Sequence, residues 1–160
     1  MLLENSFFLL GQIVEHVAII PNMVGYTLMK KLIQKKVKVR LSPHGGLGLY
    51  AEESIKKGEF VIEYIGEMIT EEEADKRLGK YLFEISKKWT LDGRGRENTA
   101  RYINHSCVPN CEADVRGTRV YIEAIKNIKP GDELTYDYQK EYFDEFLKGK
   151  CLCAKCLLNK

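Results

Sequence analysis

The hydrophobic pattern of the first 36 residues is that of an amphipathic helix. Apolar side chains recur at intervals of four, three, four and three residues, at Leu3, Phe7, Leu10, Val14 and Val17. This spacing places them on one face of an α-helix. A proline at position 21 interrupts the pattern, which then resumes and ends in lysines that suit a helix C-terminus. We therefore predict an α-helical N-terminal segment, residues 1–36, that packs on the rest of the chain as a hairpin, forms a homodimer face or lies on a membrane surface.

From residue 37 onward the pattern changes to short strands. Alternating or β-branched stretches, broken by turns that contain glycine, occupy residues 37–41, 48–51, 59–65, 119–125 and 133–138. One internal helix is predicted over residues 71–78, because Thr70 and Glu73 have the spacing of a capping box. The expected fold class is mainly β with short helices.

Composition narrows the function classes. The 160 residues are 44% hydrophobic and 30% charged, which is typical of one folded domain and excludes disorder and low complexity. A net charge of +2 gives no broad cationic field, so direct nucleic-acid binding is not expected. The apolar N-terminal stretch lacks a basic leader and contains polar residues, so neither a signal peptide nor stable membrane insertion is expected.

The cysteines point to metal chemistry. Of five, three fall within six residues: Cys151, Cys153 and Cys156. The odd count and this crowding argue against a disulfide framework and favour an intracellular, reducing compartment, without distinguishing the nucleus or a host nucleus from other locations. Structural zinc bound through sulfur takes four ligands, so a fourth must come from elsewhere, and Cys107 and Cys111 are the remaining thiols. A redox role is the alternative.

Three further motifs have both a structural and a functional interpretation. The Gly45-Gly46-Leu47-Gly48 stretch is a plain turn or a place where a ligand approaches the backbone closely. Residues 101–110 are rich in Asn, His, Ser and Cys, which need hydrogen-bond partners if buried, and either the protein or a heteroatom-rich cofactor can supply them. Tyr136 and Tyr138 have the same parity on a predicted strand, where they fill a core or line a site.

In this order the motifs resemble the SET-domain protein-lysine methyltransferases. The likeness runs from about residue 37 to 156 and rests above all on Asn-His-Ser-Cys at 104–107 followed by Glu-Leu-Thr-Tyr-Asp-Tyr at 133–138. The glycine turn, Tyr-Ile-Gly-Glu at 64–67 and Tyr-Leu-Phe at 81–83 precede them. The resemblance implies the SET fold, small β-sheets around a pseudoknot in which these two segments cross. It divides the chain into a helical segment (1–36), a SET domain (37–140) and a post-SET zinc-binding tail (141–160).

The resemblance also implies roles for individual residues. S-adenosylmethionine would be held by Gly46, Leu47, Gly48, Tyr81, Arg101, Asn104 and His105. The catalytic set would be Tyr138, the essential tyrosine of the family, with Tyr64 and Tyr136. The last of these stands where the family has Phe or Tyr, and a hydroxyl there favours monomethylation with some dimethylation. One structural Zn²⁺ would be bound by Cys107, Cys151, Cys153 and Cys156, with Cys111 a buried thiol.

The implied activity is methylation of lysines in histone tails or another basic protein, which is chromatin chemistry. There is no cysteine before Cys107, so the zinc-rich pre-SET element of many chromatin enzymes is absent from this sequence. Substrate choice would then depend on the N-terminal helices, a second subunit or a partner protein. Two other classes remain open: a non-catalytic SET-like module that binds a peptide or partner, and a four-cysteine zinc module that contacts nucleic acid through residues 30–40. Retention of Tyr138, Tyr64 and the Asn104-His105 pair favours the enzyme.

Overall fold

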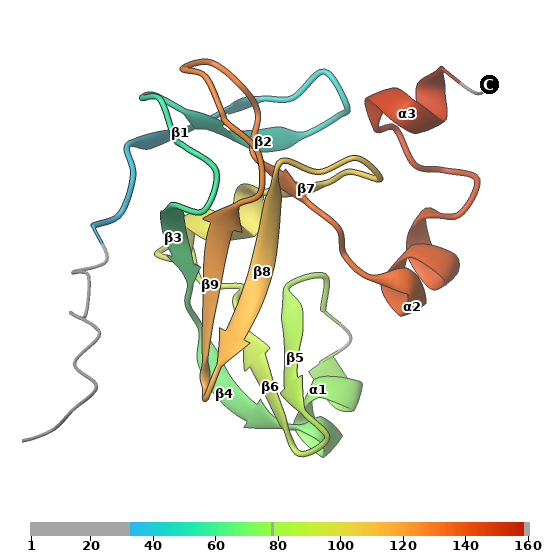
Figure 1. Ribbon diagram of the computed structural model, residues 1–160. Coiled ribbons are helices and arrows are strands. Elements are labelled where there is room, and N and C mark those ends of the chain that lie inside the picture. Colours follow the sequence, from blue (N-terminus) through green and yellow to red (C-terminus); the bar gives the residue numbers. More distant parts are fainter. Residues whose placement is uncertain (1–32, 78, 159–160) are drawn as a thin grey trace, which may run out of the picture. The chain divides into compact units, whose positions relative to one another are not determined.

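The computed structural model describes residues 33–77 and 79–158, and this part of the chain is mainly β (Figure 1). Its ten strands form four small sheets, joined by short helices. The predicted mainly β fold class is therefore confirmed. The predicted N-terminal helical segment lies outside the described residues except for 33–36, and these four are not helical. The homodimer predicted for that segment lies outside them too.

A hairpin opens the described part of the chain. Strands β1 (Val37–Leu41) and β2 (Leu47–Ala51) pair antiparallel, from Val37 opposite Ala51 to Leu41 opposite Leu47. The turn between them is closed by the Ser42 N–H, which donates to the Gly46 carbonyl at 2.9 Å. Gly45 and Gly46 have φ angles of 95° and 71°, which other residues rarely adopt. The glycines thus set the direction in which β2 enters the core.

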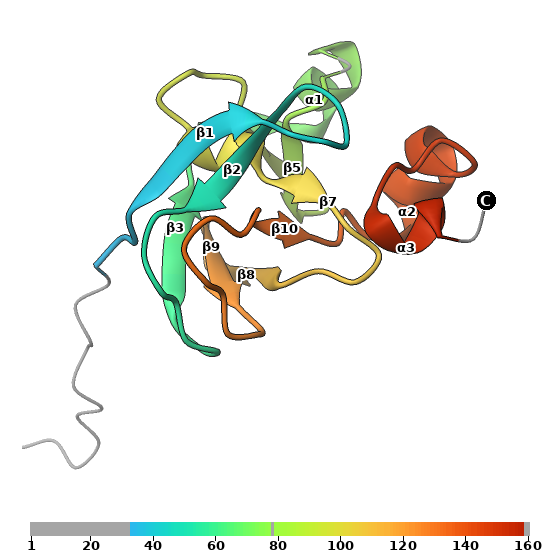
Figure 2. The same cartoon turned by 90° about the horizontal axis from the view of Figure 1, so that it is seen from above.

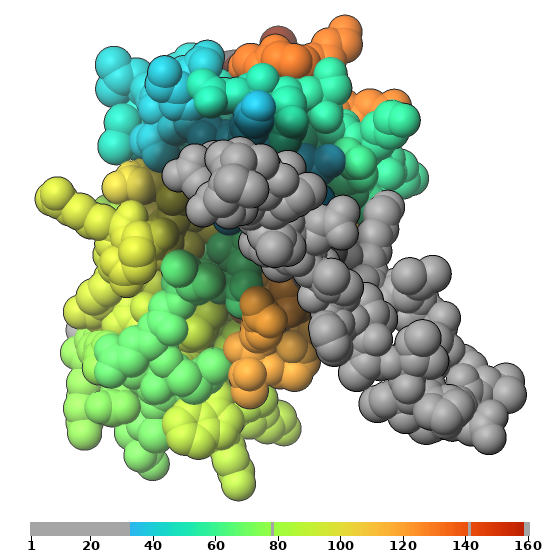
Figure 3. Space-filling model, turned by 90° about the vertical axis from the view of Figure 1, so that its left-hand side faces the viewer, coloured from blue at the N-terminus to red at the C-terminus, as the bar shows by residue number. Residues whose placement is uncertain are grey.

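The core lies against a three-stranded sheet in the order β3-β9-β8. Its strands are β3 (Phe60–Tyr64), β8 (Cys111–Arg116) and β9 (Arg119–Ala124), all antiparallel. Alternate apolar residues of β9 are fully buried, and Leu49, Ile103 and Leu134 from other segments pack into the same cluster. A shallow cavity of about 210 Å³ lies at the end of this sheet where β8 turns into β9 and β3 leads into β4, on the face shown in Figure 3.

A second three-stranded sheet has the strand order β4-β6-β5, and the internal helix α1 lies between β4 and β5 in the chain. It consists of β4 (Glu67–Thr70), β5 (Leu82–Ser86) and β6 (Trp89–Asp92). The sequence did not predict these strands, because each is only four or five residues long and polar residues interrupt its apolar pattern. Helix α1 (Glu71–Arg77) does begin at the predicted capping box: the Glu73 N–H donates to Thr70 Oγ1 at 3.3 Å, and the Thr70 N–H donates to Glu73 Oε2 at 3.4 Å.

Two segments about thirty residues apart meet as a parallel pair. Strand β7 (Asn104–His105), which follows the 3₁₀ turn η1 (Thr99–Tyr102), lies beside β10 (Thr135–Tyr136), as Figure 2 shows. The expected strand over 133–138 is shortened to two residues because the side chain of Asn110 occupies the neighbouring positions. Its Nδ2 donates to the Glu133 carbonyl at 2.8 Å, and its Oδ1 accepts from the Thr135 N–H at 2.9 Å.

The chain ends in short helical turns. Helix α2 (Lys140–Tyr142) runs into a π-helical turn, η2 (Phe143–Leu147), and α3 (Ala154–Leu157) follows. Gln139, which precedes α2, has a φ of 71°, so the chain changes direction sharply after Tyr138. No helix within residues 33–158 is long and apolar enough to cross a membrane.

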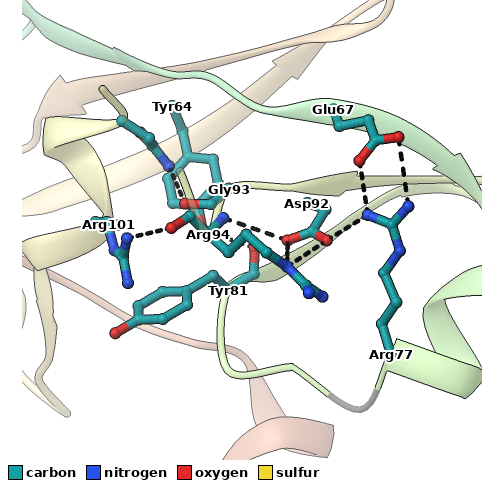
Figure 4. Close-up of polar contacts among 9 residues, drawn as sticks. Tyr64, Glu67, Arg77, Tyr81, Asp92, Gly93, Arg94 and Arg101 are labelled. Atoms are coloured by element: carbon teal, nitrogen blue, oxygen red, sulfur yellow. Dashed lines mark hydrogen bonds and ion pairs between the residues drawn. The ribbon is translucent and has the colours of Figure 1, made fainter. Parts of the chain in front are cut away.

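Asp92, at the end of β6, holds the inserted sheet and helix together. Its side chain is only 1% exposed, and Arg77 Nη1 and Arg94 Nε each lie 2.7 Å from its Oδ2 (Figure 4). The Arg94 N–H also donates to Oδ1 at 3.2 Å. Burial acts to raise the pKa of this carboxyl, but the hydrogen bonds from Arg77 and Arg94 outweigh it and hold the pKa of Asp92 below its ordinary value.

Replacing Asp92 with asparagine keeps the shape and removes the charge that both arginines face. We expect Asp92→Asn to lower the free energy of unfolding by about 2 kcal/mol near pH 7, because the charge-assisted hydrogen bonds from Arg77 and Arg94 to a buried carboxylate are weakened, while both arginines remain accessible to water. Since the pKa of Asp92 is lower in the folded protein, its carboxylate stabilises above the unfolded-state pKa of about 3.9. That contribution is lost as the pH falls through the folded-state pKa. Urea unfolding of both proteins at neutral and acidic pH measures the difference.

Glu67→Gln is the matched control, because Glu67 pairs with the same Arg77 at 2.7 Å but is exposed. We expect little change in its unfolding curve, as exposed ion pairs contribute little. Two outcomes would contradict the role given to the buried carboxylate. One is an equal loss of unfolding free energy in both variants, and the other is a loss in Asp92→Asn that is as large at acidic pH as at neutral pH.

Candidate active site

The predicted cofactor residues fall into two groups, and the first is built around Asn104. Its Nδ2 donates to the Leu47 carbonyl at 3.1 Å and to Glu133 Oε1 at 2.7 Å. A Cβ at Gly48 would lie 2.3 Å from the same carboxylate oxygen, so only glycine lets β2 come this close. The glycine turn and β7 therefore meet side by side.

Glu133 is a site residue that sequence reasoning missed as an individual. Besides Asn104, its carboxylate accepts from the hydroxyls of Ser42 at 3.1 Å and Tyr50 at 3.2 Å. It thus ties Ser42, at the start of the β1–β2 turn, and Tyr50, within β2, to the start of the tyrosine stretch. Its place directly before Leu-Thr-Tyr-Asp-Tyr gave no signal for this role, because its partners lie far away in sequence.

The second group is centred on Tyr81 (Figure 4). The guanidinium carbon of Arg101 lies 4.0 Å from the centre of the Tyr81 ring, a cation–π contact. The Tyr81 carbonyl accepts from the Tyr64 hydroxyl at 2.8 Å and from the Gly93 N–H at 2.9 Å. Arg101 also donates to the Arg94 carbonyl. The turn after Asp92 therefore fixes Tyr64, Tyr81 and Arg101 relative to one another.

Two buried side-chain atoms beside these groups lack a hydrogen-bond partner. Within the described residues, His44 Nδ1 and Arg101 Nε are the only buried side-chain nitrogen or oxygen atoms of this kind. His44 belongs to the glycine turn, and Arg101 lies over Tyr81. Because buried polar groups are nearly always satisfied, each of these two atoms has an unused capacity to hydrogen-bond a polar ligand.

Tyr138 is held at the meeting point of the two crossing segments. Its hydroxyl donates to the Ile103 carbonyl at 2.7 Å, and its backbone N–H donates to His105 Nδ1 at 3.2 Å. Its ring lies 4.9 Å from that of Tyr136 and 5.4 Å from that of His105. The hydroxyl of residue 138 is therefore next to the pair at 104 and 105, as the predicted crossing requires.

The phenols around Tyr138 are protonated well beyond neutral pH. Burial raises the pKa of Tyr64, Tyr136 and Tyr138 above the ordinary 10, and the charges of Tyr64 and Tyr142 raise the pKa of Tyr136 and Tyr138 further. Burial likewise lowers the pKa of His105, against the opposing charge of Asp137. The site thus presents neutral, polar-tipped rings rather than charged groups.

Two aromatic residues join this cluster without having been predicted as site residues. The Phe83 ring lies 5.7 Å from that of Tyr64, and the Tyr142 ring lies 5.3 Å from that of Tyr138, edge to face. Phe83 belongs to the Tyr-Leu-Phe motif at 81–83, of which only Tyr81 was predicted as a site residue. Tyr142 lies four residues after Tyr138 in the tail, and its helical spacing from Phe146 is the only signal that could have indicated it.

The four predicted cysteines form one cluster. The sulfur atoms of Cys107, Cys151, Cys153 and Cys156 all lie within 4.8 Å of one another. Four thiolates around one zinc at about 2.3 Å would stand about 3.8 Å apart in a tetrahedron, and the Cys107 and Cys156 sulfurs are 3.6 Å apart. The donor set and its spacing therefore fit one tetrahedral metal ion.

Cys153 is the cysteine whose pKa is lowered, whereas the pKa of Cys107, Cys151 and the isolated Cys111 is raised. Burial raises the pKa of Cys107 and Cys151. Burial also acts to raise the pKa of Cys153. Hydrogen bonds from the backbone of Cys107 and Cys156 and from the thiols of Cys151 and Cys156 outweigh it and lower the pKa to about 6, which favours the thiolate that binds metal. Cys111 is fully buried in the core, where burial raises its pKa to about 12.

Similar proteins are known. The SET domain family matches residues 46–139. Histone-lysine N-methyltransferase ASHH3 of Arabidopsis thaliana is 42% identical over 135 residues, which is 76% of this chain and 37% of that protein. Histone-lysine N-methyltransferase ASHR3 of the same plant is 38% identical over 136 residues, 77% of this chain and 27% of that protein. Histone-lysine N-methyltransferase 2D of Homo sapiens is 41% identical over 121 residues, 68% of this chain and 2% of that protein.

A solved structure also resembles the described fold. It is a chain of a humanized mutant of the Chaetomium thermophilum Polycomb Repressive Complex 2 bound to the inhibitor GSK126, with a TM-score of 0.62 and 35% identity over 66% of this chain and 15% of that one. This chain thus spans well under half the length of the proteins it matches. The matched residues include most of the glycine turn, the Asn-His-Ser-Cys segment at 104–107 and the tyrosine stretch at 133–138. The chain therefore belongs to the SET domain family.

Proposed function

We propose that this chain is an S-adenosylmethionine-dependent protein-lysine N-methyltransferase. The observation that carries the proposal is the parallel pairing of β7 with β10, beside which Tyr138 contacts the Ile103 carbonyl and the His105 ring. Relatives named histone-lysine N-methyltransferases, 38 to 42% identical, support the same activity. The substrate we propose is a lysine in a histone tail or another basic protein.

The cofactor would lie between the two groups of residues described above. We propose that the backbone at Gly46, Leu47 and Gly48 borders the cofactor: a Cβ at Gly46 would meet nothing within 4 Å, so that face of the turn is open, whereas Gly48 is packed against Glu133. Arg101 Nε is free to donate to the carboxylate of a bound amino-acid moiety, and the Tyr81 ring fixes the plane of the guanidinium. When bound, S-adenosylmethionine supplies a methyl group on a positively charged sulfur.

The protein's part in the reaction is to align and desolvate the incoming amine. Lysine has an ordinary pKa of about 10.4, and an apolar, aromatic channel favours the neutral amine. The rings of Tyr64, Tyr136 and Tyr138 would form that channel, with Phe83 and Tyr142 extending its wall. Holding the nitrogen lone pair in line with the methyl carbon supplies much of the rate enhancement of a two-partner displacement.

Tyr138 would orient the amine without taking its proton. Its raised pKa keeps the phenol protonated at neutral pH, and its hydrogen already points to the Ile103 carbonyl. The lone pairs of the phenol oxygen are then available to accept from the amine N–H. The proton of the substrate ammonium would leave to solvent before the nitrogen attacks.

The main rival is a SET-like module that binds a peptide without catalysis. Such a module has no need for several buried phenols that converge on one point, whereas a lysine channel does. The acidic first turn of α1, at Glu71, Glu72 and Glu73, is exposed and would attract a basic tail in either case. Only transfer of label decides between the two.

Labelled S-adenosylmethionine and a panel of histones and other basic proteins test the proposal directly. We expect label on lysine with the parent protein and a fall in kcat of at least about a hundredfold with Tyr138→Phe, because the hydroxyl that orients the amine is gone. Binding of an unmodified lysine peptide should change little. Peptide binding without transfer in the parent protein would support the binding module instead.

Tyr136 should control the number of methyl groups. We propose that the parent enzyme forms mainly monomethyl-lysine with some dimethyl-lysine, because a hydroxyl at 136 can hold a water or the amine and leaves less room for methyl groups. Tyr136→Phe should shift the product toward di- and trimethyl-lysine. Mass spectrometry of the product peptide checks this, and an unchanged distribution would contradict it.

Zinc is the metal we propose for the cysteine cluster. Metal analysis of the purified chain should give one zinc per chain, and chelation should lower its melting temperature, because metal binding contributes to folding. Cys153→Ser should lose the zinc. Cys111→Ser is the matched control: it also changes a buried thiol but should keep the full zinc content. Zinc loss in both variants, or in neither, would contradict the assignment.

A further inference from the structure

His105 lies between the cysteine cluster and the tyrosine cluster and contacts both. Its side chain is 5% exposed. On one side its Nε2 lies 3.3 Å from Cys107 Sγ. On the other its Nδ1 accepts from the Tyr138 backbone N–H at 3.2 Å. Both ring nitrogens are thus engaged with protein atoms, and only the backbone of His105 is left for the cofactor contact that the sequence predicted.

These contacts specify the tautomer of the ring. A backbone N–H is always a donor, so Nδ1 must be the unprotonated nitrogen. In a neutral imidazole the proton is then on Nε2, where it points toward the Cys107 sulfur. A metal-bound thiolate is a good acceptor for that proton, and such hydrogen bonds orient and tune metal ligands. The direction of both bonds therefore follows from the fixed donor at residue 138.

The geometry points to His105 as a positioning residue that connects the metal site to the catalytic tyrosine: its Nε2–H holds the Cys107 sulfur while its Nδ1 holds the Tyr138 backbone. The inference rests on the proposed function for its catalytic consequence. Its structural part concerns only the ring of His105 and its two partners.

The surrounding contacts make this link rigid. The His105 ring also packs against Phe143, with ring centres 5.3 Å apart. Directly after His105, the Ser106 N–H donates to the Tyr136 carbonyl at 3.1 Å, so the backbone on both sides of the ring is held by the strand pair. A shift of the Cys107 sulfur is thus carried to residue 138 through a single ring.

The tautomer can be read on the unsubstituted chain. In a ¹⁵N NMR spectrum of the zinc-loaded protein we expect His105 to show a protonated Nε2 and an unprotonated, hydrogen-bonded Nδ1. A protonated Nδ1 would overturn the inference. This measurement needs no variant, so it holds even where a substitution prevents folding.

Two substitutions separate the halves of the link. Asparagine places an acceptor oxygen near the Nδ1 position, and glutamine places a donor near the Nε2 position. We expect His105→Asn to weaken zinc affinity by roughly tenfold or more, measured against a chromophoric chelator, while the Tyr138 amide resonance stays close to its parent position. His105→Gln should keep zinc affinity within a few-fold, shift the Tyr138 amide resonance and give the larger loss of kcat.

Asp137→Asn serves as the control, because Asp137 Oδ1 lies 3.6 Å from Nδ1 but its side chain is exposed. It should leave zinc affinity unchanged and His105 Nδ1 unprotonated, whereas the Tyr138 amide resonance of this variant reports the neighbouring substitution itself. Equal changes of both readouts in the asparagine and glutamine variants would show a general packing role and overturn the inference. If none of the proteins transfers methyl groups, the proposed function fails, while the zinc and NMR readouts still decide the role of His105.

Discussion

The site depends on one short contact, the parallel pairing of β7 with β10. Two residues on each side make it: Asn104 opposite Thr135, and His105 opposite Tyr136. So short a pair would not persist alone, because it fixes too few backbone hydrogen bonds to offset the entropy of joining segments about thirty residues apart. Side chains complete it: Asn110 bonds the backbone on both sides of Leu134, and Leu134 itself is fully buried. Polar satisfaction and core packing together keep the two segments crossed.

Around this contact, different hydrogen-bond acceptors hold the two sides of the site: a side-chain carboxylate on one side and backbone carbonyls on the other. On the side of the glycine turn, one carboxylate, Glu133, gathers three donors and leaves no room for a side chain at Gly48. On the side of Tyr81, a backbone turn after the buried Asp92 supplies carbonyl groups to Asn98 and Arg101. Both arrangements use charged groups as anchors outside the aromatic centre. The centre itself can then stay neutral, as the proposed reaction of an uncharged amine requires.

The tail after residue 139 is more than a cap on the domain. Its aromatic residues continue the ring contacts of Tyr138 outward through Tyr142 to Phe146. Its cysteines return to Cys107, which lies directly after the crossing strand. The same few residues of the Asn-His-Ser-Cys segment therefore contact the glycine turn, Tyr138 and the cysteine cluster. This explains why the motif tolerates so many polar residues in a half-buried stretch.

The sequence by itself determined the strand texture, the capping box at Thr70 and the three clustered C-terminal cysteines, because these depend on local spacing and on residue chemistry. The motifs also indicated the family, and only that resemblance selected Cys107 over Cys111 as the fourth cysteine. It missed the β4-β6-β5 sheet, whose short strands carry no clear alternation, and it overextended the strand at 133–138, where the Asn110 side chain replaces the ladder. Glu133, Phe83, Tyr142 and the linking position of His105 were decided only by the tertiary structure. Their roles come from partners distant in sequence, and a chain pattern holds no information about which distant groups folding brings within hydrogen-bond reach.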